Sequence, residues 1–166
     1  MGRDMGEHGG PLYRLKRWMY PADRPNVVAR AMNRFAAWQF GNGFLAPRHW
    51  VTLEVRGRRS GRVVAFPVVV ADHQGERYLV AMLGERANWV HNVRAAGGSA
   101  VLRRGRRVPV RLVEVEATRR AAILRRYLEL APGARPHIPV DRKAPLAEFE
   151  RIAAEFPVFQ IVPEAR

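Results

Sequence analysis

The most constraining feature of this sequence is a series of short segments in which apolar and polar residues alternate, separated by glycine-containing turns. Residues 50–56 are the clearest example, because every second side chain is apolar, as in a strand with one buried face. Turns at 57–61 and 72–75 separate neighbouring strands. Pro67, inside the second segment, requires a sheet edge or a bulge. The predicted strands are residues 50–56, 63–71, 76–83, 99–104, 107–116 and 157–162.

Helical segments are expected before, between and after these strands. They run from Asn26 to the glycines at 41 and 43, from Asn88 as N-cap to about Ala96, from Thr118 as N-cap through residue 130, and over 146–156 after Pro145. Most strands are joined by hairpins and do not alternate with long helices. The pattern therefore favours an α+β fold, a closed or split six-stranded antiparallel barrel with flanking helices, over a Rossmann fold.

The 166 residues suffice for one domain. We expect a flexible basic N-terminal arm at 1–24 and a single barrel domain at 25–166. Residues 11–20 of the arm mix aromatic and basic side chains, which suits either a peripheral membrane contact or packing on this domain or a neighbouring subunit. The sequence shows no secretory signal, no transmembrane run and no cysteine, which fits a cytoplasmic location.

The net charge of +14 arises from 29 Lys and Arg against 15 Asp and Glu, and most of the excess is Arg. Guanidinium groups match the oxygens of phosphates and carboxylates, so the charge predicts an anionic partner: nucleic acid, a membrane or a polyanionic small molecule. A compositional bias that raises Arg, Ala, Gly and Pro together explains part of the excess equally well.

The turn VRGRRSGR at 55–62 has the composition of a phosphate clamp. Four Arg residues surround a hairpin tip that contains two glycines and Ser60. Glycine lets a ligand approach the backbone, and the N–H groups of such a turn can converge on an oxyanion. The alternative is a solvated basic turn. No GxxxxGK[ST] motif is present, so the turn is not a P-loop.

A second stretch, residues 84–98, combines Asn88, Trp89 and Asn92 at the start of a short helix. Trp89 and Asn92 are three residues apart and share a helix face. An indole beside a carboxamide suits a flat heteroaromatic ring, although Trp89 could equally belong to the core and Asn92 to a cap. A third basic turn, RRGRR at 103–107, is either solvated or part of an anion-binding surface.

Conventional catalytic groups are sparse. The five histidines show no metal-ligand spacing, and neither HExxH nor GxSxG occurs. We assign no metal site and no proton donor. If the protein is an enzyme, a cofactor must therefore supply the reactive atom.

At these stretches the sequence resembles the deazaflavin-dependent nitroreductase family, F-420-dependent oxidoreductases whose split β-barrel is related to flavin-binding barrels. The resemblance covers roughly residues 44–116 and extends to 157–162. It implies hydride transfer from reduced F-420 to a small, hydrophobic, electron-poor acceptor such as a quinone, enone or nitro compound, with F-420 favoured over FMN. The coenzyme's phosphodiester and polyglutamate tail would account for the Arg-rich groove.

The resemblance also implies roles for single residues. Arg58, Arg59, Ser60 and Gly61 match the turn that holds the phosphate, Pro67 and Val68 match the strand against the deazaflavin ring, and Asn88, Trp89 and Asn92 match the helix that borders the ring. Met82 is counted with this pocket. Met82 and Leu83 replace the Ser and Lys of nitroreducing members, which argues against bulky polar nitro substrates.

The sequence differs from the family pattern at two further points, and one alternative function stays open. The family turn often has Lys where Arg59 stands, so a cation is kept. Tyr127 is the sole match for a substrate-side tyrosine, and its helix makes it as suitable for the core. The rival is a non-catalytic barrel that binds a coenzyme, a lipid or nucleic acid. Nucleic acid ranks low because aromatic and basic residues do not interleave. A homodimer paired through a sheet face is also expected.

Overall fold

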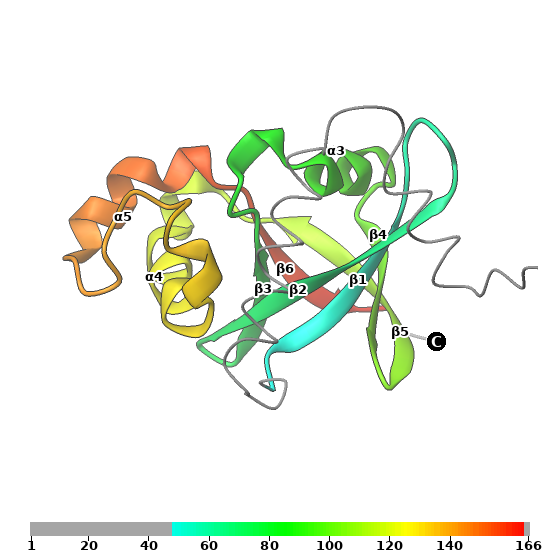
Figure 1. Cartoon of the computed structure of the whole chain (residues 1–166), viewed down its shortest axis with the longest axis horizontal. Helices are drawn as coiled ribbons and strands as arrows, with labels where there is room; N and C mark the ends of the chain where they lie inside the picture. Colours follow the sequence, from blue (N-terminus) through cyan, green and yellow to red (C-terminus); the bar gives the residue numbers. More distant parts are fainter. Residues whose placement is uncertain (1–47, 165–166) are drawn as a thin grey trace, which may run out of the picture.

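The computed structural model describes residues 48–164, which form a closed antiparallel barrel with the strand order β1-β2-β3-β6-β5-β4 (Figure 1). The six-stranded barrel predicted from the sequence is confirmed. The predicted arm at 1–24 and the predicted helix at 26–41 lie outside the described residues. The strands are β1 (Trp50–Arg56), β2 (Val63–His73), β3 (Glu76–Val80), β4 (Ser99–Arg104), β5 (Arg106–Glu114) and β6 (Val158–Pro163).

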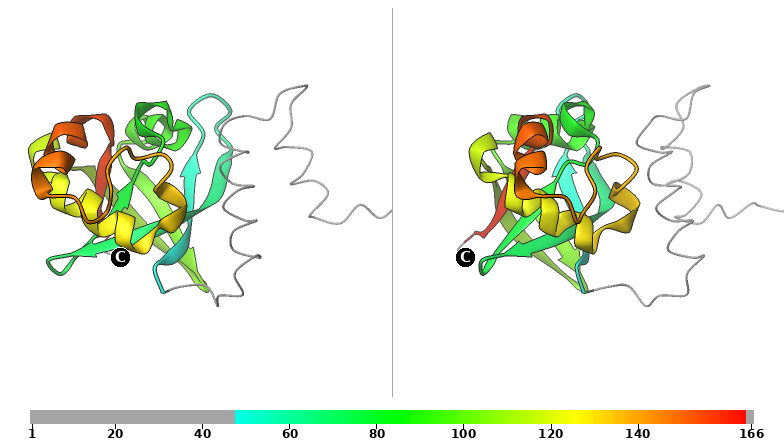
Figure 2. Two further views of the ribbon diagram at one scale, coloured as in Figure 1. Left: turned by 60° about the vertical axis from the view of Figure 1, so that its left-hand side comes forward. Right: turned by 90° about the vertical axis from the view of Figure 1, so that its left-hand side faces the viewer.

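Three α-helices accompany the strands in the described part of the chain. They are α3 (Asn88–Ala95), α4 (Ala121–Leu130) and α5 (Leu146–Ile152). Figures 1 and 2 show α3 over one end of the barrel, next to the β1–β2 turn, and α4 and α5 together on one side. None of the helices in residues 48–164 is long and apolar enough to cross a bilayer.

Several predicted boundaries are wrong. Asn88 is the first residue of α3 and not its N-cap, which is Ala87. Thr118 lies inside a 3-10 turn, and α4 begins only at Ala121. The third strand ends at Val80 because the next residues turn away from the sheet. Gly84 closes that turn with a φ of 65°, a backbone conformation that favours glycine.

The barrel interior holds one apolar cluster, which α3 closes at its end. Leu53, Leu79 and Phe159 are buried among the inward side chains of the strands. Val90 and Val93 of α3 complete the same cluster. Burial of these apolar surfaces therefore fixes α3 over the barrel end, and the residues on α3 inherit that fixed position.

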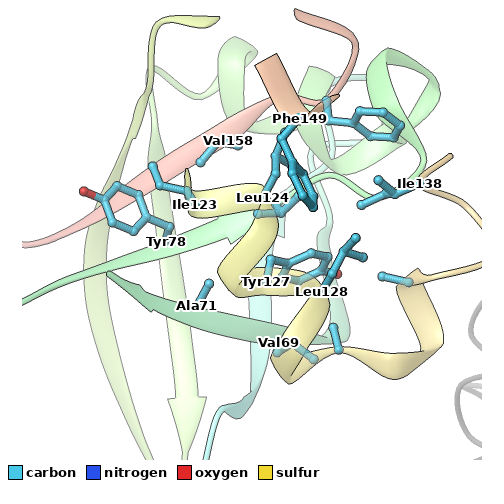
Figure 3. Close-up of a cluster of buried hydrophobic side chains, with 14 of the residues drawn as sticks. Val69, Ala71, Tyr78, Ile123, Leu124, Tyr127, Leu128, Ile138, Phe149 and Val158 are labelled. Carbon is cyan, nitrogen blue, oxygen red and sulfur yellow. The ribbon is translucent and has the colours of Figure 1, made fainter. Parts of the chain in front are cut away.

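A second apolar cluster joins the outer face of β2, β3 and β6 to α4 and α5. Figure 3 shows Leu124, Tyr127 and Leu128 of α4 between strand β2, which carries Val69 and Ala71, and the residues Phe149 and Ile138 on the other side. Tyr127 is 5% exposed, and its burial raises the pKa of the phenol. Tyr127 is therefore a core residue.

Pro67 lies at a sheet edge, as the sequence required. Residues 63–69 of β2 pair with β1, whereas pairing with β3 begins only at Val70. Val70 donates its N–H to His49 O at 2.7 Å, and N–H groups alternate sides along a strand. The nitrogen of Pro67 is therefore directed away from β1, and the missing N–H removes no β1–β2 hydrogen bond.

The two glycines after α3 let the chain reverse tightly against β5. Gly98 has a φ of 84°, and its oxygen accepts a hydrogen bond from Leu112 N at 2.8 Å. A Cβ added at Gly98 would lie 2.5 Å from Leu112 O. Gly105, at the β4–β5 tip, has a φ of 74° and nothing within 4 Å of an added Cβ.

These two glycines give a matched test of the close approach. We expect Gly98→Ala to lower the free energy of unfolding by about 3 kcal/mol, since strain and steric overlap add. Gly105→Ala should lower the free energy of unfolding by only about 1 kcal/mol, because the positive φ is strained for alanine but the added Cβ meets no other atom. Urea denaturation of both variants measures the difference. Equal losses would show that the contact with Leu112 contributes nothing.

Candidate cofactor site

The β1–β2 turn is closed by its own backbone. Gly57 N donates to Arg62 O, and Gly61 N donates to Gly57 O, each at 2.8 Å. The Ser60 hydroxyl accepts a hydrogen bond from Arg62 N at 3.2 Å. A Cβ at Gly57 would lie 3.0 Å from Ser60 Oγ, so the turn leaves little room for any other residue there. The turn is therefore an ordered loop whose conformation is fixed by its own hydrogen bonds.

Arg58 joins this turn to helix α3. Its backbone N–H and its guanidinium Nη1 both donate to the Asn92 Oδ1 atom, at 3.1 and 3.0 Å. Asn92 is only 6% exposed, so this acceptor is held firmly within the fold. The two stretches singled out in the sequence therefore meet at one oxygen atom. This contact also occupies one of the turn N–H groups that we expected to face an anion.

The positive charge of the turn has no acidic counterpart in the described part of the chain. No ion pair among residues 48–164 involves Arg56, Arg58, Arg59 or Arg62. All four side chains are exposed. Four adjacent guanidinium groups repel one another, so a bound anion would relieve that repulsion.

Trp89 lies in an aromatic group at the end of the barrel. Its ring centroid is 6.4 Å from that of Phe66 and 5.4 Å from that of Phe159, with interplanar angles of 43° and 55°. Trp89 is half-buried and packs on the barrel cluster. Trp89 is therefore partly a core residue and partly an accessible indole on the helix that carries Asn92.

The remaining predicted residues fall into two groups. Val68 packs with the same cluster as Trp89, while Pro67 and Asn88 are exposed on β2 and at the start of α3. Met82 packs instead on the cluster formed with α4 and α5. Leu83 contacts the Trp89 cluster. The structure thus brings Val68 and Trp89 together and places Met82 with a different set of neighbours.

A network of ion pairs fixes α3 from the side opposite the turn. The Arg94 guanidinium binds Glu85 at 2.7 and 2.9 Å and Glu114 at 2.6 and 3.0 Å. These bonds hold the pKa of Glu85 below its ordinary value and raise the pKa of Arg94. The two carboxylates on one guanidinium group tie α3 to β5 and to the residues before the helix.

Buried Arg120 extends the network into the helical side of the domain. It donates to Val115 O at 2.7 Å and to Ala153 O and Phe156 O at 3.3 Å, and lies 3.4 Å from Glu114. Desolvation lowers the pKa of its guanidinium. Arg120 joins the ends of β5 and β6 to α4 through backbone acceptors.

Sequence reasoning missed the aromatic neighbours and the ion pairs. Phe159 is 70 positions from Trp89, and nothing local marks the pair. Glu114 and Arg94 are likewise 20 positions apart. Only Phe159 had a signal in the sequence, because the alternation of the last strand puts it at an inward position.

Comparison with solved structures finds similar chains at low sequence identity. A protein solved as a domain-swapped dimer is 20% identical, with a TM-score of 0.47 over 83% of this chain and 99% of that chain. An F-420-H(2)-dependent reductase, FDR-A, is 23% identical, with a TM-score of 0.42 over 69% of this chain and 94% of that chain. A protein of unknown function from Agrobacterium tumefaciens has a TM-score of 0.50 at 11% identity, over 70% of this chain and 49% of that chain, which concerns the fold alone.

Comparison with sequences is more specific. No curated protein matches the chain significantly. The family model described as F-420H(2)-dependent quinone reductase matches residues 27–147, which is more than half of the chain and includes both the turn and α3. The resemblance to F-420-dependent oxidoreductases is thereby confirmed. The chain belongs to the F-420H(2)-dependent quinone reductase family and is an oxidoreductase that uses coenzyme F-420.

Proposed function

We propose that this enzyme passes a hydride from reduced F-420 to a quinone, with the coenzyme held between the β1–β2 turn and α3. The observation that carries the proposal is the bond from Arg58 to Asn92 Oδ1, which joins the two parts of the site. The matched family is named for a quinone acceptor, and we extend that acceptor to this chain. Enone and nitro acceptors remain rivals to be tested.

The turn fits the acidic end of the coenzyme. Arg59 and Arg62 are exposed and have no acidic partner among residues 48–164, and Ser60 and Gly61 lie between them. Arg58 uses Nη1 for Asn92 and keeps its other guanidinium donors. We propose that Arg58 and Arg59 grip the phosphate, with Ser60 and Gly61 next to it.

The surfaces beside the turn suit a flat ring. Trp89 presents a half-buried indole, and Pro67 and Val68 follow Phe66 on the neighbouring strand. When bound, F-420 supplies the hydride. The residues of this chain orient the ring and exclude water from it, and we propose Asn88 and Asn92 as polar neighbours of the ring edge. Met82 is proposed for the outer rim only, since it packs toward α4 and α5.

Assembly and location are proposed on separate grounds. Val113 and Val162 are 45% and 37% exposed on the outer face of β5 and β6, a face that suits a second copy of this chain. We propose a homodimer through this face, which light scattering would test. A cytoplasmic enzyme fits the absence of cysteine, and peripheral membrane contact rests on residues 11–20 alone.

The direct test is a fluorescence titration of the purified protein with F-420, followed by turnover of reduced F-420 with menadione. We expect a dissociation constant of about micromolar or tighter and loss of the reduced coenzyme only when the quinone is present. If the protein binds F-420 but does not oxidise the reduced coenzyme with the quinone, it is a non-catalytic coenzyme-binding protein. Failure to bind F-420 would remove the proposal.

Removing the phosphate clamp should weaken F-420 binding. We expect Arg58→Ala combined with Arg59→Ala to lower F-420 affinity by about 100-fold, because charge-assisted hydrogen bonds to the phosphate are lost. The matched control is Arg125→Ala combined with Arg142→Ala, which removes the same charge from the other side of the domain. If both double variants bind F-420 equally, net charge and not the clamp determines affinity.

Asn92 gives a second, independent test. Asn92→Ala removes the acceptor for Arg58, so we expect about 10-fold weaker F-420 binding and a loss of about 1.5 kcal/mol in unfolding free energy. Asn92→Asp keeps an acceptor but adds a negative charge beside the turn. It should retain stability yet weaken F-420 binding, and added salt should reduce that difference. Unchanged affinity in both variants would refute the role of this contact.

A further inference from the structure

Helix α3 presents different faces to three surroundings. Val90 and Val93 pack into the barrel cluster, and Asn92 accepts the two hydrogen bonds from Arg58. Arg94 lies two residues after Asn92, which places the two side chains about 200° apart around the helix axis. Arg94 therefore faces away from the β1–β2 turn, toward residues that the proposed coenzyme site does not include.

Arg94 joins two parts of the chain that flank α3. Its guanidinium group binds both oxygens of Glu85, at 2.7 and 2.9 Å, and both oxygens of Glu114, at 2.6 and 3.0 Å. Glu85 lies between β3 and α3 in residues 81–87, called the β3–α3 connection below, and Glu114 ends β5. His91, three residues before Arg94 on the same helix face, has its Nε2 atom 2.8 Å from Glu85 O. This face of α3 is therefore tied to both neighbouring segments.

The β3–α3 connection is itself packed tightly against the helical side of the domain. Gly84 has a φ of 65°, and a Cβ added there would lie 2.8 Å from Glu155 O. Leu83, next to Gly84, contacts the same apolar cluster as Trp89. The connection can be followed in Figure 1 between the labels of β3 and α3. It is a fixed support, so the bonds from α3 to Glu85 hold the helix against a part of the protein that has little room to move.

These bonds restrict rotation of α3 about its own axis. The apolar contacts of Val90 and Val93 are not directional, so they define the rotation angle less closely than hydrogen bonds do. A side chain about 6 Å from the axis moves by about 1 Å when the helix rotates by about 10°. Trp89 would undergo a shift of this kind. The bonds of Asn92 on one side and of Arg94 on the other oppose it together.

We propose that Arg94 is a positioning residue for hydride transfer, because it holds Trp89 at the angle at which the indole orients the deazaflavin ring. The inference rests on the proposed function, since it requires the ring to lie beside Trp89. Arg94 acts through Glu85 and Glu114 and contacts neither the coenzyme nor the acceptor. A misplacement of about 1 Å can slow a reaction by about 100-fold, so even a small rotation of α3 lowers the rate of this step.

Coenzyme affinity responds less than the rate to the loss of Arg94. The β1–β2 turn keeps its shape through its own bonds, from Gly57 N to Arg62 O and from Gly61 N to Gly57 O. The cations proposed to bind the phosphate therefore remain in place when α3 rotates slightly. A slower hydride transfer at nearly unchanged affinity distinguishes a positioning role from a binding role.

Arg126 supplies a matched control on the helical side of the domain. It lies on α4 and also binds two carboxylates, Asp72 at 3.1 and 3.3 Å and Glu129 at 2.9 Å. Its side chain is 35% exposed, against 36% for Arg94. Arg94→Gln and Arg126→Gln therefore remove the same charge and the same kind of ion pair, but Arg126 is not on the helix that carries Trp89.

The experiment measures the F-420 dissociation constant by fluorescence, the rate of a single turnover of bound, reduced F-420 with excess menadione, and amide hydrogen exchange of the protein without coenzyme. For Arg94→Gln we expect a single-turnover rate about 10-fold lower and a dissociation constant changed by less than about 3-fold. Exchange in residues 84–95 should be about 10-fold faster, because the helix is less firmly held. Arg126→Gln should match the wild-type protein in all of these quantities.

Glu85→Gln is a milder second variant, because Glu85 is 53% exposed and the bonds from Arg94 to Glu114 are kept. It should lower the single-turnover rate by about 3-fold, and it decides the matter if Arg94→Gln does not fold. Urea denaturation of each variant ensures that rates are compared between folded proteins.

Equal single-turnover rates for Arg94→Gln and Arg126→Gln would overturn the inference, as would a wild-type rate for Glu85→Gln. A loss of affinity as large as the loss of rate would also overturn it, because Arg94 would then act on binding. These outcomes leave the proposed function intact. If the wild-type protein neither binds F-420 nor reduces menadione, the proposed function fails and the inference fails with it.

Discussion

One amide oxygen, Asn92 Oδ1, joins the two halves of the candidate site. It accepts both donors of Arg58 and thereby sets the turn of a β-hairpin against a helix 34 residues later. Since Asn92 is nearly buried in the helix that closes the barrel, the turn takes its position from the apolar core. The precision of the site thus comes from hydrophobic packing, transmitted to a charged surface loop through a single polar atom.

Among residues 48–164, two groups of arginines differ in what their side chains contact. Arg94 and Arg120 are surrounded by carboxylates or backbone carbonyls and tie α3, β5 and the helical side together. Arg58, Arg59 and Arg62 lack acidic partners in the described residues. The first kind holds the fold and the second remains available for an anion. Net charge alone could not have separated them, since both contribute equally to it.

Much of the barrel could be predicted from the sequence, because alternation and turn residues are local signals. The predicted strands at 50–56 and 99–104 match β1 and β4 in full. Helix starts were placed wrongly, since Asn88 and Thr118 have cap-like side chains that the structure does not use as caps. The contacts of Trp89 with Phe159 and of Arg58 with Asn92 needed the folded chain, because tertiary proximity leaves no mark on local sequence.

The proline in β2 has a consequence for the molecule among its neighbours. Residues 63–69 lack a β3 partner, and an open strand of this kind can recruit a strand from another molecule and start uncontrolled assembly. At Pro67 the outward position has no hydrogen to donate, so an incoming strand would find its hydrogen-bond pattern interrupted. The proline ring therefore protects an unpaired part of β2 against pairing with a strand of another molecule, without a further strand having to cover it.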